Sequence, residues 1–520
     1  MSGLARHTQK MTYKIIDLFA GPGGLGEGFA TYKKGTIFDI ALSAEMESSA
    51  HQTLTLRSFF RKIQGDQKAL NAYYSFCESA DSPHPRDLFP LAWKAASAEA
   101  HQLTLGNPEH NQQLDALLKQ AKLREDETVL IGGPPCQAYS LVGRARNMGK
   151  QDYIAENDHR HFLYKEYLRI LHRSRPAVFV MENVKGILSA KVGGKLVFHD
   201  ILRDLTDPGQ ALGKRDGARY TIHSLVSPAK FVHGDDPEEL DASEFVIKAE
   251  KFGIPQARHR VILLGVREDL GYDGKKFLRE SDPLCVEDAF SGMPLLRSKL
   301  STSDSDKGWC EAVLSNANML YKDAIAQRMG TLAEELKAGM LRMNGSLATG
   351  ALRFPRHNAF HGQTTFHKWV TDPRLNVWLN HEARSHMSSD LARYYFTAVF
   401  GKTFNRSPKG HHDFSLKGLA PDHANWESGK FADRFRVQLQ KAPSTTVTSH
   451  IAKDGHYFIH PDPRQCRSLT VREAARLQTF PDNYFFQGNR TQQYHQVGNA
   501  VPSLLANQIA HVVNLIVSGA

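Results

Sequence analysis

The feature that most constrains the fold of this chain is a buried strand that runs directly into a glycine-rich turn. Residues 13–20, YKIIDLFA, form an apolar run, and residues 21–28, GPGGLGEG, follow it at once. Glycine lets a backbone approach a ligand closely, and ligands of open α/β sheets bind beyond the carboxyl ends of the strands. The pattern therefore predicts an α/β domain with a ligand site at this turn. A Rossmann dinucleotide site would explain the turn nearly as well as any other nucleotide-like site.

The same alternation of strands and helical stretches continues along the chain. The further strands that apolar runs predict are FDIALSAE at 38–45, VLIGG at 129–133, AVFVMEN at 177–183 and RVILLGV at 260–266. Strands that alternate with helices indicate a parallel sheet with helices on both faces. The second strand ends at Glu45, whose carboxylate could hold ribose hydroxyls. NAD and S-adenosylmethionine (SAM) both carry such hydroxyls, so the strand pattern alone leaves the cofactor open.

A chain of 520 residues exceeds the size at which one hydrophobic core stops growing, so at least two domains are expected. Residues from about 55 to 125 exceed what a strand crossover needs, and amphipathic patterns such as LDALLKQAKL predict a helical insertion there. Between about 270 and 440 the α/β rhythm is lost, which predicts a separate domain of irregular or small-sheet character. The α/β pattern returns near the end of the chain with the segments LTVREAARLQTF and QVGNAVPSLLANQIAHVVNLIV. We therefore predict a discontinuous first domain, residues 1–275 and 435–520, and an inserted second domain at 276–434.

Positive charge is concentrated in the predicted second domain. The chain carries a net charge of +10, and residues 341–440 hold 14 Lys and Arg against 7 Asp and Glu. This excess suggests a polyanionic partner, although a solvated surface with excess charge explains the composition equally well. No apolar run approaches the length of a membrane span, and the N-terminus has no secretory signal. We therefore expect a cytoplasmic protein that contacts no membrane.

The five cysteines are few, odd in number and widely spaced, with no CxxC pair. This spacing argues against a disulfide framework and a structural zinc site, so no metal site is expected. Cys136 differs from the others because it follows two prolines just after a buried strand, in GGPPCQAYS. The prolines stiffen the loop, and a partly exposed thiol near backbone donors or basic groups ionises more readily. Cys136 is thus a candidate nucleophile, although a lone cysteine in a tight turn is more commonly structural.

Two further motifs place charged side chains at strand ends. Glu182, in ENV, ends a buried strand, where active-site groups of α/β proteins gather. The alternative is a carboxylate of an ordinary strand-to-helix turn. QARHR carries Arg258 and Arg260 on one face of an extended segment, and a surface ion-pair cluster is the alternative there. The segment NHEARSHMSSD has the spacing HExxxH rather than HExxH, so a zinc peptidase site is not expected.

Taken together, these motifs resemble the ordered motifs of the C5-cytosine methyltransferases. The segments that carry the resemblance occur in that family's order: DLFAGPGG, GPPCQAYS, MENVKG, QARHR, LTVREAARLQTFPD and QVGNAVP. DHRHFLYKEYLRIL at 158–171 is also similar to the helix that precedes the ENV strand in the family. The resemblance covers residues 13–267 and about 435–516, apart from the helical insertion. Each motif alone is weak, but six in this order are very specific.

The resemblance implies a Rossmann-like, SAM-dependent methyltransferase fold with an inserted target-recognition domain. In the reaction of this family, a thiolate adds to carbon 6 of a flipped cytosine, and a methyl group is transferred to carbon 5. Cys136 matches the nucleophile, and Glu182 matches the glutamate that engages the ring at N3 and the exocyclic amine. Arg258 and Arg260 match the arginines that position the nucleophile, the glutamate and the adjacent backbone. The residues that match the family's SAM site are Phe19, Ala20, Gly21, Gly23, Glu45, Met46, Asn499 and Val501.

Two details of the SAM site depart from the family pattern. Met46 stands where the family often has Trp, which implies weaker stacking on adenine. The aspartate that commonly contacts the adenine amino group has no clear counterpart, because the predicted insertion falls between the relevant strands.

The resemblance implies a DNA (cytosine-5)-methyltransferase that acts on double-stranded DNA, is a monomer and belongs to a restriction-modification system with a cognate endonuclease. The second domain would read base edges in the major groove. A related enzyme that acts on tRNA is the main alternative, but its recognition region is usually shorter. A DNA-binding homologue that has lost catalysis is a further alternative, against which the intact PPCQ, ENV and QxRxR segments count. A Rossmann oxidoreductase has no use for PPC and ENV together.

Overall fold

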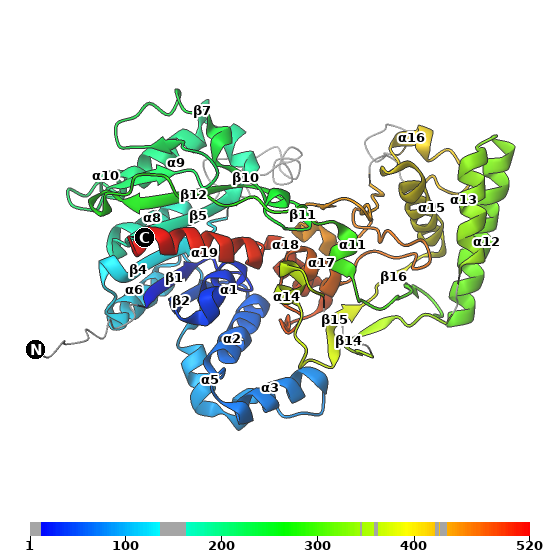
Figure 1. Ribbon diagram of the computed structural model, residues 1–520, viewed down its shortest axis with the longest axis horizontal. Helices are drawn as coiled ribbons and strands as arrows, with labels where there is room; N and C mark the ends of the chain where they lie inside the picture. The colour runs from blue at the N-terminus through cyan, green and yellow to red at the C-terminus, as the bar shows by residue number, and fades with distance from the viewer. Residues whose placement is uncertain are drawn as a thin grey trace, which may run out of the picture.

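The structure is a computed structural model that describes residues 12–135, 163–343, 346–357, 362–421, 426 and 434–519 (Figure 1). Within these residues the centre of the molecule is a nine-stranded sheet in the order β3-β2-β1-β4-β5-β12-β8-β9, with β10 paired to β12. All five strands that the apolar runs predict are present, with bounds within two residues of the prediction. The strands are β1 Tyr13–Leu18, β2 Phe38–Glu45, β3 Ala100–Gln102, β4 Thr128–Gly132, β5 Val178–Val184, β8 Tyr220–His223, β9 Lys230–Phe231, β10 Val246–Lys248 and β12 His259–Arg267.

The sheet is mixed, whereas the sequence pattern predicts a parallel one. Strands β3, β2, β1, β4 and β5 are parallel to their neighbours. β12 runs antiparallel to β5, with Arg260 opposite Val184 and Ile262 opposite Glu182. β8, β9 and β10 also pair in the antiparallel sense. An apolar run looks the same in either direction, so the sequence pattern carries no information on this reversal.

Helices cover both faces of the sheet, as predicted. Ile15 faces the side covered by α1 and α19, and its neighbour Ile16 faces the side covered by α6, α8 and α9. In Figure 1 the C-terminal helix α19 crosses the sheet in front of β1 and β4. The bounds of these helices are α1 Gly24–Thr31, α6 Pro108–Ala121, α8 Leu163–Ser174, α9 Val197–Thr206 and α19 Ser503–Val517.

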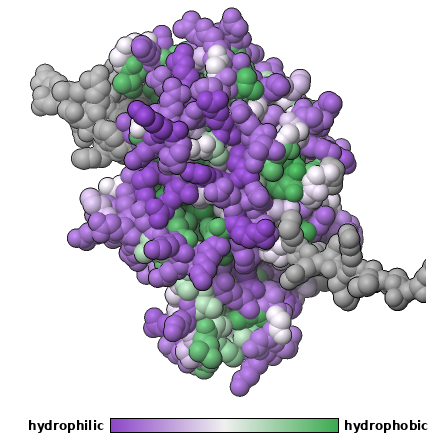
Figure 2. All heavy atoms as spheres, turned by 90° about the vertical axis from the view of Figure 1, so that its left-hand side faces the viewer, coloured by the Kyte–Doolittle hydropathy of each residue, from purple (hydrophilic) through white to green (hydrophobic). Residues whose placement is uncertain are grey.

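The predicted helical insertion is partly a piece of the sheet. β3 lies in its middle and extends the sheet by pairing in parallel with β2. This strand escapes sequence analysis because its three residues form no apolar run. The helices beyond α2 make a lower lobe, on which Figure 2 shows hydrophobic side chains at the surface, and Leu91 in this lobe is 83% exposed. The helices of this stretch are α2 Ser48–Lys62, α3 Gln67–Glu78, α4 Pro85–Leu88 and α5 Pro90–Ser97.

The region predicted as a second domain is built mainly of helices, so the expectation of irregular or small-sheet character is wrong for its core. α12, α13 and α15 pack around buried residues such as Trp309 and Tyr395. These helices are only weakly amphipathic, and α15 is buried on nearly every side, so their sequences show little helical periodicity. A hairpin of β14 and β15 lies between these helices in the sequence. The elements are α11 Val286–Phe290, β13 Lys299–Leu300, α12 Asp306–Ala326, α13 Gly330–Leu341, β14 Gly350–Pro355, α14 Thr365–Val370, β15 Val377–Glu382, β16 Ser385–His386, α15 Ser388–Phe404 and α16 Gly410–Asp413.

The chain returns to the sheet with three helices near its end. Thr470 and Glu473 form a capping box at the start of α17, which confirms the predicted helix in LTVREAARLQTF. Residues Arg490–Val517, which comprise α18 and α19, are long and apolar enough to cross a membrane. This finding corrects the expectation that no run approaches that length, but 67% of the apolar window is buried inside the protein. The remaining elements are β6 Lys191–Val192, β7 Lys195–Leu196, α10 Pro208–Ala211, β11 Gln256–Ala257, β17 Ser444–Thr445, α17 Val471–Leu477 and α18 Arg490–Asn499.

Candidate active site

The glycine-rich turn lies between the end of β1 and the start of α1, at the carboxyl ends of the parallel strands. Phe19, Gly21 and Gly23 have positive φ angles of 56°, 57° and 97°, which glycine adopts far more readily than other residues. Phe19 therefore holds a strained backbone of the kind that gathers at binding sites. A Cβ atom on Gly24 would lie only 2.4 Å from the carbonyl oxygen of Val501. Two segments predicted to bind the cofactor, far apart in sequence, thus meet at this turn.

Glu45 ends β2 beside the turn and bonds to its backbone. Its Oε2 accepts a hydrogen bond from the Gly21 N–H at 2.7 Å, and its Oε1 accepts one from the Glu47 N–H at 2.7 Å. Burial raises the pKa of the Glu45 carboxyl above its ordinary value. The next side chain, Met46, is 56% exposed. A carboxylate with free lone pairs and an exposed apolar side chain therefore stand beside the turn, which suits a ligand with hydroxyls and a flat ring.

The segment after α18 completes this side of the site. Asn499 ends the helix and is exposed, whereas Val501 is buried. Gln478, which sequence analysis did not single out, holds the segment by donating to the carbonyl oxygens of Val497 at 2.7 Å and Ala500 at 3.1 Å. A single buried amide side chain gives no pattern in the sequence, so the role of Gln478 could not be predicted from the sequence.

Glu182 and Arg260, predicted from separate motifs, form an ion pair. Arg260 Nε lies 2.9 Å from Glu182 Oε1, and the two side chains are 14% and 12% exposed. The antiparallel pairing of β12 with β5 brings them to the same end of the sheet. A Cβ atom on Gly133, just past β4, would lie 3.1 Å from Glu182 Oε2. The carboxylate therefore lies against the strand end from which the loop containing Cys136 departs.

The start of that loop is tied to the ENV segment. Asn183 Nδ2 donates to the carbonyl oxygen of Pro134 at 3.3 Å, and Asn183 Oδ1 accepts from the Val184 N–H at 2.8 Å. Cys136, the predicted nucleophile, lies outside the described residues. Pro135, the last described residue before Cys136, lies three residues beyond the end of β4.

Arg258 serves a different part of the site from Arg260. It is buried, and its guanidinium donates to the carbonyl oxygens of Val447 at 2.8 Å and Gly498 at 3.4 Å. Burial, with the nearby charge of Arg260, lowers the pKa of this guanidinium well below its ordinary range. Arg258 therefore fixes the segment that leads to the predicted SAM residues, while Arg260 fixes the carboxylate.

Two polar residues at the strand ends were not predicted. Gln102, the last residue of β3, donates from Nε2 to the carbonyl oxygen of Met46 at 3.3 Å. It lies beside the end of β2, and the short strand gave no signal for it. Asp17 is buried in β1, and neither of its carboxylate oxygens has a hydrogen-bond partner among the described residues. The position of Asp17 within the DLFAGPGG motif is the sequence feature that could have identified it.

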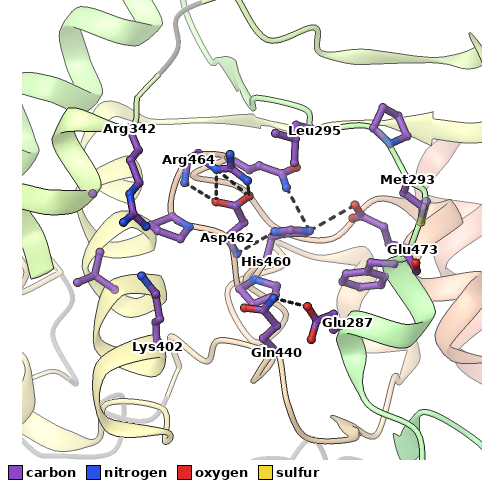
Figure 3. Close-up of a pocket in the computed structure, with 18 of the residues that line it drawn as sticks. Glu287, Met293, Leu295, Arg342, Lys402, Gln440, His460, Asp462, Arg464 and Glu473 are labelled. Carbon is purple, nitrogen blue, oxygen red and sulfur yellow. Dashed lines mark hydrogen bonds and ion pairs between the residues drawn. The ribbon is translucent and has the colours of Figure 1, made fainter. Parts of the chain in front are cut away.

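A cavity of about 520 Å³ lies elsewhere, between α11, the helices α13 and α15, and the loop at 460–465. Figure 3 shows Lys402 on the helical side of this space, opposite the loop that carries His460 and Asp462. Asp462 pairs with Arg464 at 2.6 Å, and burial lowers the pKa of His460 to about 4, so the ring is neutral. None of the described residues predicted for the site lines this cavity. We therefore assign the candidate site to the strand ends, where the reactive groups gather.

Comparison with known proteins identifies the family of this chain. The chain matches the family model of the C-5 cytosine-specific DNA methylases over residues 100–225 and 241–514. It is 32% identical to the type II methyltransferase M.Bpa9945I of Bacillus paralicheniformis, over 97% of this chain and 99% of that protein. It is 29% identical to the DNA (cytosine-5-)-methyltransferase M.ApeKI of Aeropyrum pernix, over 75% of this chain and 81% of that protein.

Among solved structures, a prophage-encoded E. coli protein described as a DNA modification methyltransferase aligns with a TM-score of 0.53. The two chains are 19% identical, and the alignment covers 98% of this chain and 100% of the other. This likeness supports the fold. The family match begins at β3 and extends into α19, so it covers well over half of the chain. The chain therefore belongs to the C-5 cytosine-specific DNA methylases, a family that uses SAM as its methyl donor.

Proposed function

We propose that this chain transfers a methyl group from SAM to carbon 5 of a cytosine within a specific duplex DNA sequence, with Cys136 as the nucleophile. The observation that carries the proposal is the Glu182–Arg260 ion pair beside Gly133, at the start of the loop that bears Cys136. A nucleophile loop, a carboxyl group and a fixed guanidinium at adjacent strand ends provide the groups that covalent attack on a heteroaromatic ring requires.

The described residues fit SAM. A Cβ atom on Gly21 would have no atom within 4 Å, so the turn borders open space on that side. The Glu45 carboxylate can accept from ribose hydroxyls, and the exposed Met46 can cover the adenine ring. SAM supplies an electrophilic methyl group to the reaction. The residues that would surround it are Phe19, Ala20, Gly21, Gly23, Glu45, Met46, Asn499 and Val501.

Each polar residue of the site has a distinct task in this chemistry. Carbon 5 of cytosine is a poor nucleophile, so the Cys136 thiolate first adds to carbon 6 and shifts electron density toward carbon 5. Glu182 engages N3 and the exocyclic amine as that density develops, and Arg260 holds its carboxyl in place. After methylation carbon 5 loses its proton, the carbon–sulfur bond breaks, and the double bond of the ring is restored. A base stacked in a duplex cannot meet these groups, so the cytosine must be flipped out.

The region at 276–434 is proposed as the target-recognition domain, and its excess positive charge suits contact with phosphates. Its length favours duplex DNA over tRNA as the substrate. We further propose that the enzyme is a cytoplasmic monomer of a restriction-modification system with a cognate endonuclease. The type II methyltransferases to which the chain is similar support that setting.

Methyl transfer from labelled SAM to duplex DNA and to tRNA tests the proposal. The wild-type protein should label duplex DNA only, and Cys136→Ser should abolish labelling because a hydroxyl is far less nucleophilic than a thiolate. Cys310→Ser, which changes a half-buried cysteine of α12, is the matched control and should retain activity. Transfer to tRNA in place of DNA, or near wild-type turnover by Cys136→Ser, would overturn the proposal.

A further inference from the structure

The glycine-rich turn is held by a tyrosine that lies 462 residues further along the chain. The Tyr484 hydroxyl donates to the carbonyl oxygen of Pro22 at 2.5 Å, in a fully buried setting. The neighbouring N–H groups are bonded as well: that of Gly21 to Glu45 at 2.7 Å, and that of Gly23 to the Ala20 carbonyl at 2.9 Å. The Tyr484 bond therefore fixes the Pro22 carbonyl, which directly precedes the anchored amide of Gly23.

Tyr484 also sets the space that the turn occupies. A Cβ atom on Gly23 would lie 3.0 Å from the Tyr484 hydroxyl oxygen and 2.8 Å from Cδ1 of Leu54. Gly23 has a φ of 97°, which leaves this position to glycine on conformational grounds too. The turn is thus pressed against the hydroxyl, and its shape depends on where that hydroxyl is held.

The ring of Tyr484 is itself held firmly. Phe480 and Phe486 pack against it with ring centroids at 4.8 and 5.4 Å. The guanidinium of Arg57 lies 4.8 Å from the ring centroid. Arg57 donates to Asn483 Oδ1 at 2.9 Å and forms a buried ion pair with Glu27 of α1. The helix that follows the turn and the segment that carries Tyr484 are therefore joined through one guanidinium.

We propose that Tyr484 is a positioning residue for SAM, which acts by fixing the Pro22 carbonyl and so the shape of the turn. The inference rests on the proposed function, in which this turn surrounds the cofactor. Tyr484 touches neither reacting atom, so its removal should weaken SAM binding and spare the chemical step.

Tyr484→Phe removes one oxygen atom and keeps the ring. SAM affinity measured by calorimetry in the absence of DNA should fall about tenfold, because a turn released from Tyr484 must be ordered again when SAM binds, at a cost comparable to one buried hydrogen bond. The KM for SAM should rise by a similar factor, and kcat at saturating SAM should stay within about twofold of the wild type.

Tyr220→Phe is the matched control. Tyr220 is also fully buried and donates to a prolyl carbonyl, that of Pro176 at 3.1 Å, but Pro176 precedes β5, at the opposite end of that strand from Glu182. Thermal unfolding should show a similar loss of stability in both variants, while only Tyr484→Phe loses SAM affinity. Equal SAM affinity in Tyr484→Phe and the wild type, or an equal loss in Tyr220→Phe, would overturn the inference. A wild-type protein that binds no SAM would instead refute the proposed function.

Discussion

The ion pair between Arg260 and Glu182 predicts a large catalytic loss when the guanidinium is removed. The two groups lie 2.9 Å apart with little exposure, so water screens them only weakly. Arg260→Met keeps most of the aliphatic stem but leaves the carboxylate of Glu182 without its partner. Breaking a buried pair from one side costs about 3 kcal/mol. If that cost falls on the transition state, kcat/KM drops roughly 150-fold.

Labelled methyl transfer at low DNA concentration measures this loss, and thermal unfolding reports whether each variant is folded. Arg267→Met is the matched control, because Arg267 lies in the same strand and its side chain is 7% exposed. Arg267 pairs with Asp269 at 2.7 Å and with Asp126, at the far end of β12. The control should lose stability but keep kcat/KM within about threefold of the wild type. A folded Arg260→Met enzyme with activity in that same range would refute the role assigned to the pair.

Three further predictions test the site, the recognition region and the sheet. Glu182→Gln should slow single-turnover methylation far more than it weakens DNA binding, because an amide can hydrogen-bond to the ring but cannot deliver a proton; a loss confined to binding would reassign Glu182 to recognition. Exchange of residues 290–434 for the matching segment of a relative should change the methylated sequence, mapped in DNA from expressing cells, and keep the chemistry. An active chimera that methylates the original sequence would place specificity elsewhere. Burial raises the pKa of Asp17 to about 8, so its contribution to stability is fully present below about pH 4 and is lost as pH rises toward 8. The unfolding free energy of Asp17→Asn should therefore rise relative to that of the wild type by roughly 1 kcal/mol per pH unit between about pH 5 and 7.5. A difference between the two proteins that does not change with pH would contradict this.

The sequence predicts the elements that carry long apolar runs. β2 is found over the predicted residues, and β12 extends the predicted run by one residue at each end. Direction and pairing could not be predicted in the same way, because they depend on contacts between distant segments. Glu182 and Arg260 were both singled out, but only the antiparallel register of β5 and β12 shows that they meet.

The residues that sequence analysis missed are those whose role comes from burial. Gln478 and Tyr484 act through side-chain hydrogen bonds to backbone carbonyls, and such bonds leave no spacing or composition to detect. β3 is too short to give a pattern. The helical core around α12 and α13 escapes sequence analysis for a different reason, since its helices are weakly amphipathic and show little periodicity.

The covalent intermediate at Cys136 is the central claim, and a suicide substrate tests it most directly. A duplex that carries 5-fluorocytosine at the methylated position blocks the last step, because carbon 5 then has no proton to lose. With saturating SAM, a protein–DNA adduct that survives denaturation should accumulate, with the mass of the chain, the DNA and one methyl group, and Cys136→Ser should form none. If a preparation that methylates ordinary duplex DNA forms no such adduct, or if Cys136→Ser still forms it, the account of this active site is contradicted.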